Sequence, residues 1–305
     1  MPKWESTLLL IPHVDVMLLN QTPDCQIIML NTLLEALTEY NLHTFLKNRI
    51  SEMIPLLKKL ADIEGQIQRF RDQGETFSRI ADICITLEDD TQAIDFFQRA
   101  RKVGEIHGFI GLESVACRGL GELFLKDGRL DEGMGLLRNA VIAAPLAEGD
   151  TQYLEVVALK TLLSSVLMYQ PTWDDDNQKE MKELALKYCV LSQLILSKDQ
   201  DTPKLLVFVL MSFLTQAQVL HRIGDASGAR DAMGKLLSSL QNTAQRPEVH
   251  AVYRHIYMEQ VEHAIKFIAI YFEDEREWDD LLNDFKIERS RFDNESKSRS
   301  MTQSH

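Results

Sequence analysis

Three side chains near the end of the chain have the types and spacing of a metal site. His255, Glu259 and His263 recur at every fourth position, so on a helix they share one face, where imidazole and carboxylate groups can bind a metal ion. No His-Glu-x-x-His or Glu-x-x-His sequence accompanies them, and a second helix with matching ligands is not evident. We therefore interpret them as a solvated helix face, with a metal site as the alternative, and predict no metal and no cofactor.

Two further segments have residues that could carry chemistry. The glycines of KVGEIHGFIGLES, residues 102–114, do not follow a predicted strand and lack the context of a phosphate or dinucleotide loop, so we interpret the segment as a turn between repeats. The acidic run from Trp173 to Asp176 has the charge to bind a cation, but a solvated loop is the simpler interpretation. Because no Gly-x-Ser-x-Gly elbow occurs either, we predict that the protein is not an enzyme.

The charge balance argues against two classes of partner. The chain has 33 Lys and Arg against 46 Asp and Glu, a net charge of -13, which repels a phosphate backbone or an anionic membrane surface. The longest uncharged stretch, Leu205 to Leu220, is shorter than the roughly 20 residues that a spanning helix needs. We therefore predict no nucleic acid partner and no membrane insertion.

The cysteines and the N-terminus indicate the compartment. The four cysteines, at 25, 84, 117 and 189, form no Cys-x-x-Cys pair, so we read them as small core residues rather than disulfide or zinc ligands. The apolar run near the N-terminus is too short, and its flanks too acidic, for a secretory signal. Both features favour a reducing, cytoplasmic location, with the nucleus as an alternative.

The elements that position these residues are helices. Apolar residues recur at i, i+3, i+4 and i+7 from residue 24 to residue 285, which is the helical period. Thr22-Pro23 and Thr202-Pro203 mark helix starts, and Gly128, Gly149 and Gly224 mark turns. The chain therefore reads as short helices joined by short turns, which is typical of αα-hairpins.

The hairpins repeat along the chain. A shift of 40 residues brings residues 77–84 over residues 117–124, and then Ala93, Phe97 and Ala100 over the equivalent small and large residues of the next copy. This pattern resembles the tetratricopeptide repeat, in a long form similar to that of G-protein-signalling modulators and related adaptors. The structural positions of the pattern are Phe77, Ala81, Ala93, Phe97, Ala100, Gly121, Phe124, Gly128, Gly133, Ala140, Pro145, Ala217, Gly224 and Ala229.

The resemblance implies an all-α fold, a right-handed superhelical solenoid of antiparallel helix pairs. Ala81 with Ala93, the glycines 121 and 133, and the alanines 217 and 229 should lie where paired helices cross, because only small residues allow close approach. The predicted organisation is N-terminal helices as a cap or degenerate repeat (1–73), repeats (74–113, 114–155, 156–209 degenerate and 210–241), a C-terminal hairpin cap (247–293) and a disordered tail (294–305). The turn at 171–179 lengthens the degenerate repeat.

In the family, the inner face of the first helix of each pair lines a partner-binding groove. The matching positions here are Ser78, Asp82, Thr86, Arg118, Glu122, Lys126, Lys160, Ser164, Met168, Leu214, Gln218, His221 and Arg222. Their cations gather in the second and third copies, so the expected partner is a protein or peptide segment with carboxylates and apolar anchors. Simple solvation of these side chains is the alternative.

The resemblance thus predicts a non-catalytic scaffold or adaptor that binds a partner segment in its concave groove. A different class of function is a structural subunit that uses its convex face or terminal helices, with apolar area exposed around Trp278 and Leu281. An enzyme is the third reading, and it would need a pocket with converging titratable groups.

Overall fold

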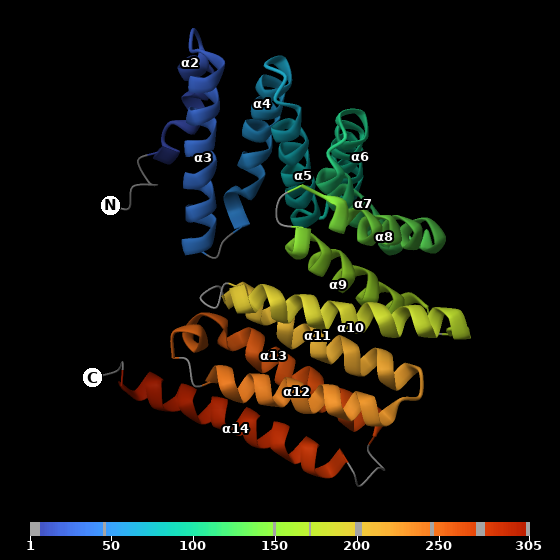
Figure 1. Cartoon of the computed structure of the whole chain (residues 1–305). Helices are drawn as coiled ribbons and strands as arrows, with labels where there is room; N and C mark the ends of the chain where they lie inside the picture. Colours follow the sequence, from blue (N-terminus) through green and yellow to red (C-terminus); the bar gives the residue numbers. More distant parts are fainter. Residues whose placement is uncertain are drawn as a thin grey trace. The chain divides into compact units, whose positions relative to one another are not determined.

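The computed structural model describes residues 7–44, 47–148, 151–170, 172–198, 203–244, 247–272 and 278–302, and these ranges contain helices and turns but no strand. The elements are η1 (Ile11–His13), α2 (Val14–Leu18), α3 (Pro23–Thr44), η2 (Lys47–Glu52), α4 (Met53–Gln66), α5 (Phe70–Thr86), α6 (Asp90–His107), α7 (Ile110–Lys126), α8 (Leu130–Ala143), η3 (Ala144–Leu146), α9 (Thr151–Tyr169), α10 (Asp175–Lys198), α11 (Pro203–Arg222), α12 (Ala226–Ala244), α13 (Pro247–Tyr271) and α14 (Asp279–Thr302). The predicted all-α fold of antiparallel helix pairs is confirmed (Figure 1).

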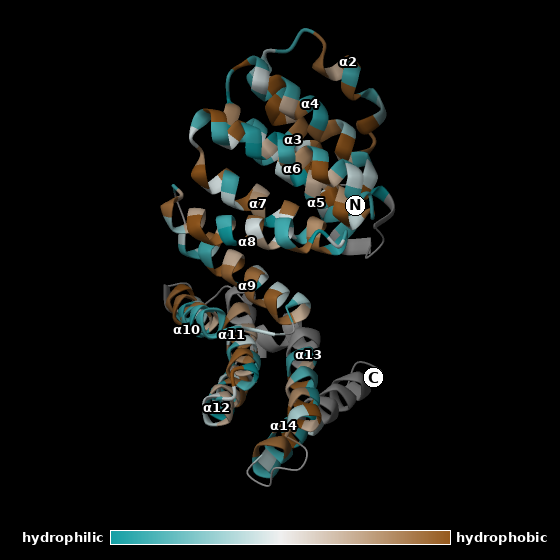
Figure 2. Cartoon of the chain, turned by 90° about the vertical axis from the view of Figure 1, so that its right-hand side faces the viewer, coloured by the Kyte–Doolittle hydropathy of each residue, from teal (hydrophilic) through white to brown (hydrophobic). Residues whose placement is uncertain are grey.

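The chain divides into two compact units, Met1–Ala158 and Leu159–His305. In unit 1, each helix from α3 to α8 packs against the next one along the chain, and α5 also contacts α7. In unit 2, α11 packs against α10, α12 and α13. Apolar and polar residues alternate along the helices (Figure 2), so each helix buries one side against its neighbours.

The turns of unit 1 repeat with a fixed spacing. Gln68, Glu88, Gly108 and Gly128 all have positive φ, between 61° and 80°, and each follows the end of a helix. The amide of the next residue then bonds to the carbonyl five positions back, as in Arg69 N to Glu64 O at 2.8 Å, which is the Schellman end of a helix. The same turn therefore recurs every 20 residues, and two turns make the 40-residue repeat.

A pair of glycines forms the crossing of α7 and α8. A Cβ on Gly121 would lie 2.7 Å from Cδ2 of Leu137 and 3.0 Å from the carbonyl oxygen of Gly133. A Cβ on Gly133 would lie 2.9 Å from the carbonyl oxygen of Gly121. Real Cβ atoms essentially never lie under 3.0 Å from a backbone oxygen, so Gly133 requires glycine, and a Cβ at Gly121 would force Leu137 and the facing backbone to shift. The alanines at the other predicted crossings, 81, 93, 217 and 229, are fully buried.

Unit 1 and unit 2 have separate clusters of buried apolar residues. Phe97 and Ala100 are fully buried in the cluster of unit 1 and Ala140 in α8, while Phe124 is buried and Phe77 partly so. Cys84, Cys117 and Cys189 are buried, as predicted for small core residues, and Cys25 is exposed. Pro145 lies exposed in η3.

Three expectations from the sequence are wrong in detail. The acidic run is only half in a loop: Trp173 and Asp174 precede the helix, α10 begins at Asp175, and Asp174 Oδ1 accepts from the amide of Asn177 at 2.8 Å, because carboxylates stabilise a helix N-terminus. The turn before α10 is correspondingly short. Trp278 and Leu281 are buried, since Trp278 stacks on Phe272 with ring centroids 3.8 Å apart.

The C-terminal segment also differs from its prediction. Helix α14 continues to Thr302 through most of the stretch whose polar composition predicts disorder. Residues 294–302 contain neither proline nor glycine, so nothing in them interrupts a helix that has already begun. Helix α5 likewise begins at Phe70, ahead of the predicted repeat boundary at residue 74.

Candidate partner-binding site

The predicted groove positions of α5 and α7 adjoin a small cavity in unit 1. Ser78 lies in the cavity wall, and Asp82 follows one turn later on α5. On α7, Val115 lines the cavity and Arg118 follows one turn later. We call the cavity together with these next turns the α5–α7 face.

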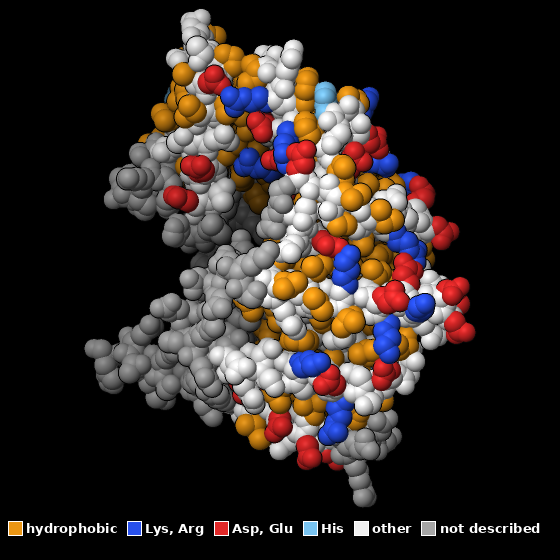
Figure 3. Space-filling view, viewed as in Figure 1, with side chains coloured by type: hydrophobic (Ala, Val, Ile, Leu, Met, Phe, Trp, Pro, Cys, Tyr) orange, Lys and Arg blue, Asp and Glu red, His pale blue; other side chains and the backbone are white. Residues whose placement is uncertain are grey.

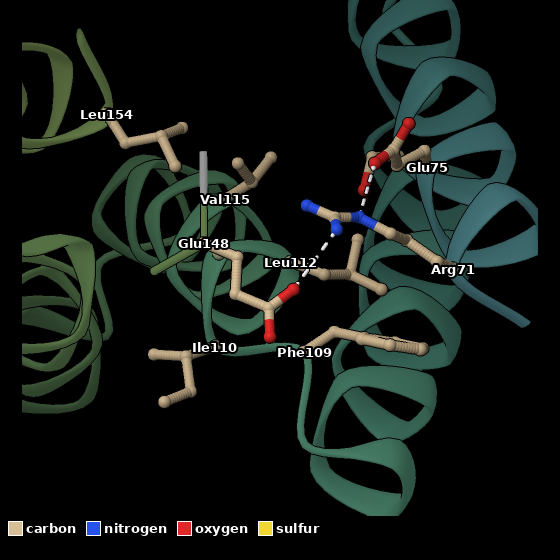
Figure 4. Close-up of a pocket in the computed structure, with 10 residues that line it drawn as sticks. Arg71, Glu75, Phe109, Ile110, Leu112, Val115, Glu148 and Leu154 are labelled. Carbon is tan, nitrogen blue, oxygen red and sulfur yellow. Dashed lines mark hydrogen bonds and ion pairs between the residues drawn. The ribbon is translucent and has the colours of Figure 1, made fainter. Parts of the chain in front are cut away.

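The cavity itself is small and largely apolar (Figure 4). Its volume is about 210 Å³, below the roughly 300 to 1,000 Å³ of small-molecule sites. Its apolar walls come from α7, the turn before α7 and the start of α9, and they consist of Phe109, Ile110, Gly111, Leu112, Val115 and Leu154. A cavity of this size and lining fits one large aliphatic side chain.

An arginine bridges the mouth of the cavity. Arg71 Nε lies 3.3 Å from Glu75 Oε1, and Arg71 Nη1 lies 3.3 Å from Glu148 Oε2. Figure 4 shows the guanidinium pointing across from α5 toward Glu148. Both ion pairs are longer than the 2.7 to 2.9 Å typical of charge-assisted bonds, and both carboxylates are exposed, so they hold the arginine weakly.

The cations predicted to attract an acidic partner already have carboxylates beside them. Arg118 Nη1 lies 3.1 Å from Glu122 Oε2, and Lys126 Nζ lies 2.5 Å from Asp90 Oδ2. On the face drawn in Figure 3, acidic and basic side chains are interspersed. The predicted groove cations of unit 1 are therefore members of ion pairs rather than open sites for a carboxylate.

Asp82 is the exception among these charged groups. Its carboxylate has no hydrogen bond or ion pair within the part of the chain that the structure describes, whereas its backbone carbonyl accepts from Thr86 Oγ1 at 3.0 Å. The surrounding protein desolvates the carboxyl and raises its pKa, while Arg118 opposes the shift. Asp82 is nevertheless exposed, one turn beyond the cavity wall, so neighbouring protein removes only part of the water around its carboxyl.

A second hollow lies in unit 2, and we call it the α11 hollow. Its volume is about 580 Å³, within the range of ligand sites. Its lining joins α9, α11 and α13, and consists of Ser164, Leu167, Met168, Gln218, His221, Arg222, Phe267 and Tyr271. Five of the predicted groove positions thus meet in one place, together with two aromatic residues that the sequence did not single out.

The aromatic side of the α11 hollow is closely packed. The ring centroid of His221 lies 4.5 Å from that of Tyr271 and 5.8 Å from that of Phe267. On the opposite helix, Met168 is 73% exposed. Aromatic and methionine side chains of this kind are typical of surfaces that bind apolar residues.

Two predicted groove residues of unit 2 have structural roles instead. Arg222 donates from Nη1 to the carbonyl of Gln170 and from Nη2 to that of Leu167, both at 2.8 Å, and so closes the C-terminal end of α9. Leu214 is 7% exposed and belongs to the core of unit 2, because α11 has neighbours on several sides. Lys160 lies over the ring of Phe208, 5.8 Å from its centroid.

Two features concern a metal site and a membrane span, and the structure bears on them only in the ranges it describes. No group of three or more His, Cys, Asp and Glu side chains there could hold a metal ion. The side chain of His255 lies outside the described residues, so the structure does not test whether His255, Glu259 and His263 form the predicted solvated face or the alternative metal site. None of the described helices combines the length and the apolarity needed to cross a membrane.

One buried carboxyl does have a strongly shifted pKa. Desolvation of Glu64 in α4 raises its pKa to about 7, although the hydroxyl of Thr76 donates to Oε2 at 2.9 Å. Glu64 is 5% exposed and faces a neighbouring helix rather than a hollow. We read it as a packing feature.

Solved structures similar to this chain were found at low identity. They include BtubC (BKLC) from P. vanneervenii, at 13% identity and TM-score 0.49, covering 74% of this chain and 93% of that one. A putative kinesin light chain of Podosopora anserina with nearly identical TPR-like repeats has 14% identity and TM-score 0.47, covering 70% of this chain and 94% of that one. A Rap protein complexed with Competence and Sporulation Factor has 10% identity and TM-score 0.48, covering 95% and 85%.

These values are too low to indicate a shared function. No protein-family model matches the chain, and no curated protein matches it by sequence. The fold therefore rests on the helix pairs, turns and crossings described above.

Several residues of both hollows were not predicted from the sequence. Arg71 was missed because the first repeat was expected to begin at 74, and Glu75 because the groove positions taken from the family pattern begin at Ser78, although both precede Ser78 and Asp82 on the same helical face. Phe267 and Tyr271 were assigned to a capping hairpin. Continuing the spacing of the groove positions toward the start of α5 would have found Arg71 and Glu75.

Proposed function

We propose that this protein is a non-catalytic scaffold that binds segments of partner proteins on the faces of α5, α7, α9 and α11 that carry the predicted groove positions. The observation that supports this most is the α11 hollow, where five of those positions line one concave surface of ligand-site size. Exposed methionine and aromatic side chains bury apolar anchors well. A partner side chain in this hollow would gain contact area without a change in the backbone.

Substitution of an exposed residue in the hollow tests the proposal. Met168→Glu places a charge where an apolar anchor would bind, and its exposure means that the fold should tolerate the change. The matched control is Leu186→Glu on α10, also exposed at 55% and also in unit 2. Both variants should keep the far-UV circular dichroism and melting temperature of the wild type.

The measurement is quantitative affinity purification with mass spectrometry from a lysate of the source cells. Partners that depend on the hollow should be depleted at least about tenfold by Met168→Glu and retained by Leu186→Glu. Equal recovery with both variants would exclude the hollow as the binding surface.

A second candidate function is a structural subunit that assembles through its N-terminal elements. Four large apolar side chains there are highly exposed: Leu9 at 70%, Val16 at 75%, Leu19 at 67% and Ile28 at 65%. Exposed apolar patches often mark contacts between subunits. Light scattering coupled to size exclusion distinguishes the candidates, because self-association that Val16→Glu abolishes would favour the subunit.

A further inference from the structure

We propose that the α5–α7 face binds a basic segment in which a lysine or arginine lies two positions from a large aliphatic residue. This inference rests on the proposed scaffold function and names the chemistry of a partner for unit 1. The sequence predicts an acidic partner, whereas the inferred partner is basic. Three observations support it: the net charge of the face, the unpaired carboxylate of Asp82 and the size of the cavity.

The charge of the face is the first step. Three carboxylates belong to it, Glu75, Asp82 and Glu148, and Glu122 lies one turn beyond Arg118, against the two guanidinium groups of Arg71 and Arg118. Each guanidinium already contacts a carboxylate, so the surplus charge is negative. The chain as a whole also carries -13, and this field attracts a cationic segment and repels an anionic one.

The unpaired carboxylate of Asp82 is the second step. It is exposed and has no bonding partner in the described part of the chain, while its surroundings already disfavour its ionised form. A carboxylate in this state gains more from a cationic donor than a fully hydrated one does, because less water must be displaced. Asp82 would therefore accept from the ammonium or guanidinium group of the partner.

The cavity supplies the third step, because it fixes the spacing of the two anchors. Ser78 in the cavity wall and Asp82 are four residues apart on α5, which corresponds to about 6 Å along a helix. Residues i and i+2 of an extended peptide are separated by about 6.5 Å. An extended segment with a cation two positions from a leucine or isoleucine can thus reach Asp82 and fill the cavity together.

Short fluorescein-labelled peptides with amidated ends test this inference by fluorescence anisotropy. The probes are Arg-Ser-Leu and Leu-Ser-Arg peptides in a glycine-serine background, because the direction of binding is open. Their controls exchange arginine for glutamate or leucine for alanine. At least one of the two arginine–leucine peptides should bind about tenfold more tightly than both of its controls.

Two isosteric variants complete the experiment. Asp82→Asn should weaken the arginine–leucine peptide about tenfold. Asp62→Asn, an equal change of net charge at an exposed position of α4 in the same unit, should leave its affinity within about twofold. Circular dichroism melts of both variants should match the wild type, which separates loss of binding from loss of fold.

Each failure has a distinct meaning. Tighter binding of the glutamate peptide, equal effects of the two variants, or no binding of any basic peptide would overturn the inference. The proposed scaffold function has its own readout in unit 2, since partner capture that depends on Met168 would persist when the basic peptides fail. Loss of both readouts would refute both proposals.

Discussion

The crossing of α7 and α8 allows a test in which the same substitution has opposite effects at two glycines. Replacing a glycine by alanine inside a helix stabilises it by about 0.8 to 1 kcal/mol. At Gly135 in α8, a new Cβ would meet nothing within 4 Å, so Gly135→Ala should gain this full amount. At Gly121, the new Cβ would lie 3.0 Å from a backbone oxygen and 2.7 Å from Leu137, and overpacking of this kind costs about 1 to 3 kcal/mol.

Gly121→Ala should therefore lie about 1 to 3 kcal/mol below Gly135→Ala in free energy of unfolding. Urea unfolding followed by far-UV circular dichroism measures this difference, and both sites lie in unit 1, so they report on the same transition. Equal stabilisation by the two substitutions would show that the helices are farther apart than described. Gly121→Leu should be more destabilising still.

Two further predictions concern single residues of unit 1. Glu88→Gly should raise the melting temperature, because Glu88 has φ of 62° and a non-glycine residue in that region costs about 1 kcal/mol; a lower melting temperature would contradict this. Glu64→Gln should remove one pH dependence: the folded pKa of about 7 lies above the 4.5 of a free glutamate, so the contribution of this carboxyl to stability is full below pH 4.5 and is lost as pH rises through 7. The variant should be on the order of 2 to 3 kcal/mol more stable than wild type at pH 8, with no such gain at pH 4, and parallel pH profiles in chemical denaturation would refute the assignment.

The turns show which parts of the fold could be predicted from the sequence. Gly128 and Gly224 are recognisable because glycine before a polar residue marks positive φ, and both take it here. Gln68 and Glu88 take the same conformation without any compositional signal. The 20-residue spacing of the turns was therefore hidden, and with it the equivalence of the N-terminal helices to the later ones.

The candidate site also has features that the sequence predicts and features that it does not. The resemblance to the repeat family predicted Asp82 and Arg118 as groove positions, and helical periodicity gives which residues share a face. Ion pairs between helices depend on side-chain directions that periodicity does not give. The pairing of Lys126 with Asp90 and the capping of α9 by Arg222 changed the expected charge of the groove for this reason.

Arg118 decides between the two partner charges by the sign of a single effect. If the partner of the α5–α7 face is acidic, Arg118→Gln removes an attractive charge and should weaken binding. If it is basic, the same change removes a repulsion near Asp82, on which Arg118 acts electrostatically, and releases Glu122 from its ion pair. An exposed interaction of this kind is worth about 0.5 to 1 kcal/mol, so the affinity for an arginine–leucine peptide should rise roughly two- to fivefold. Glutamine keeps part of the aliphatic stem and a hydrogen-bond donor without the charge, and a fall in affinity for the basic peptide would show that the positive charge of Arg118 serves the partner.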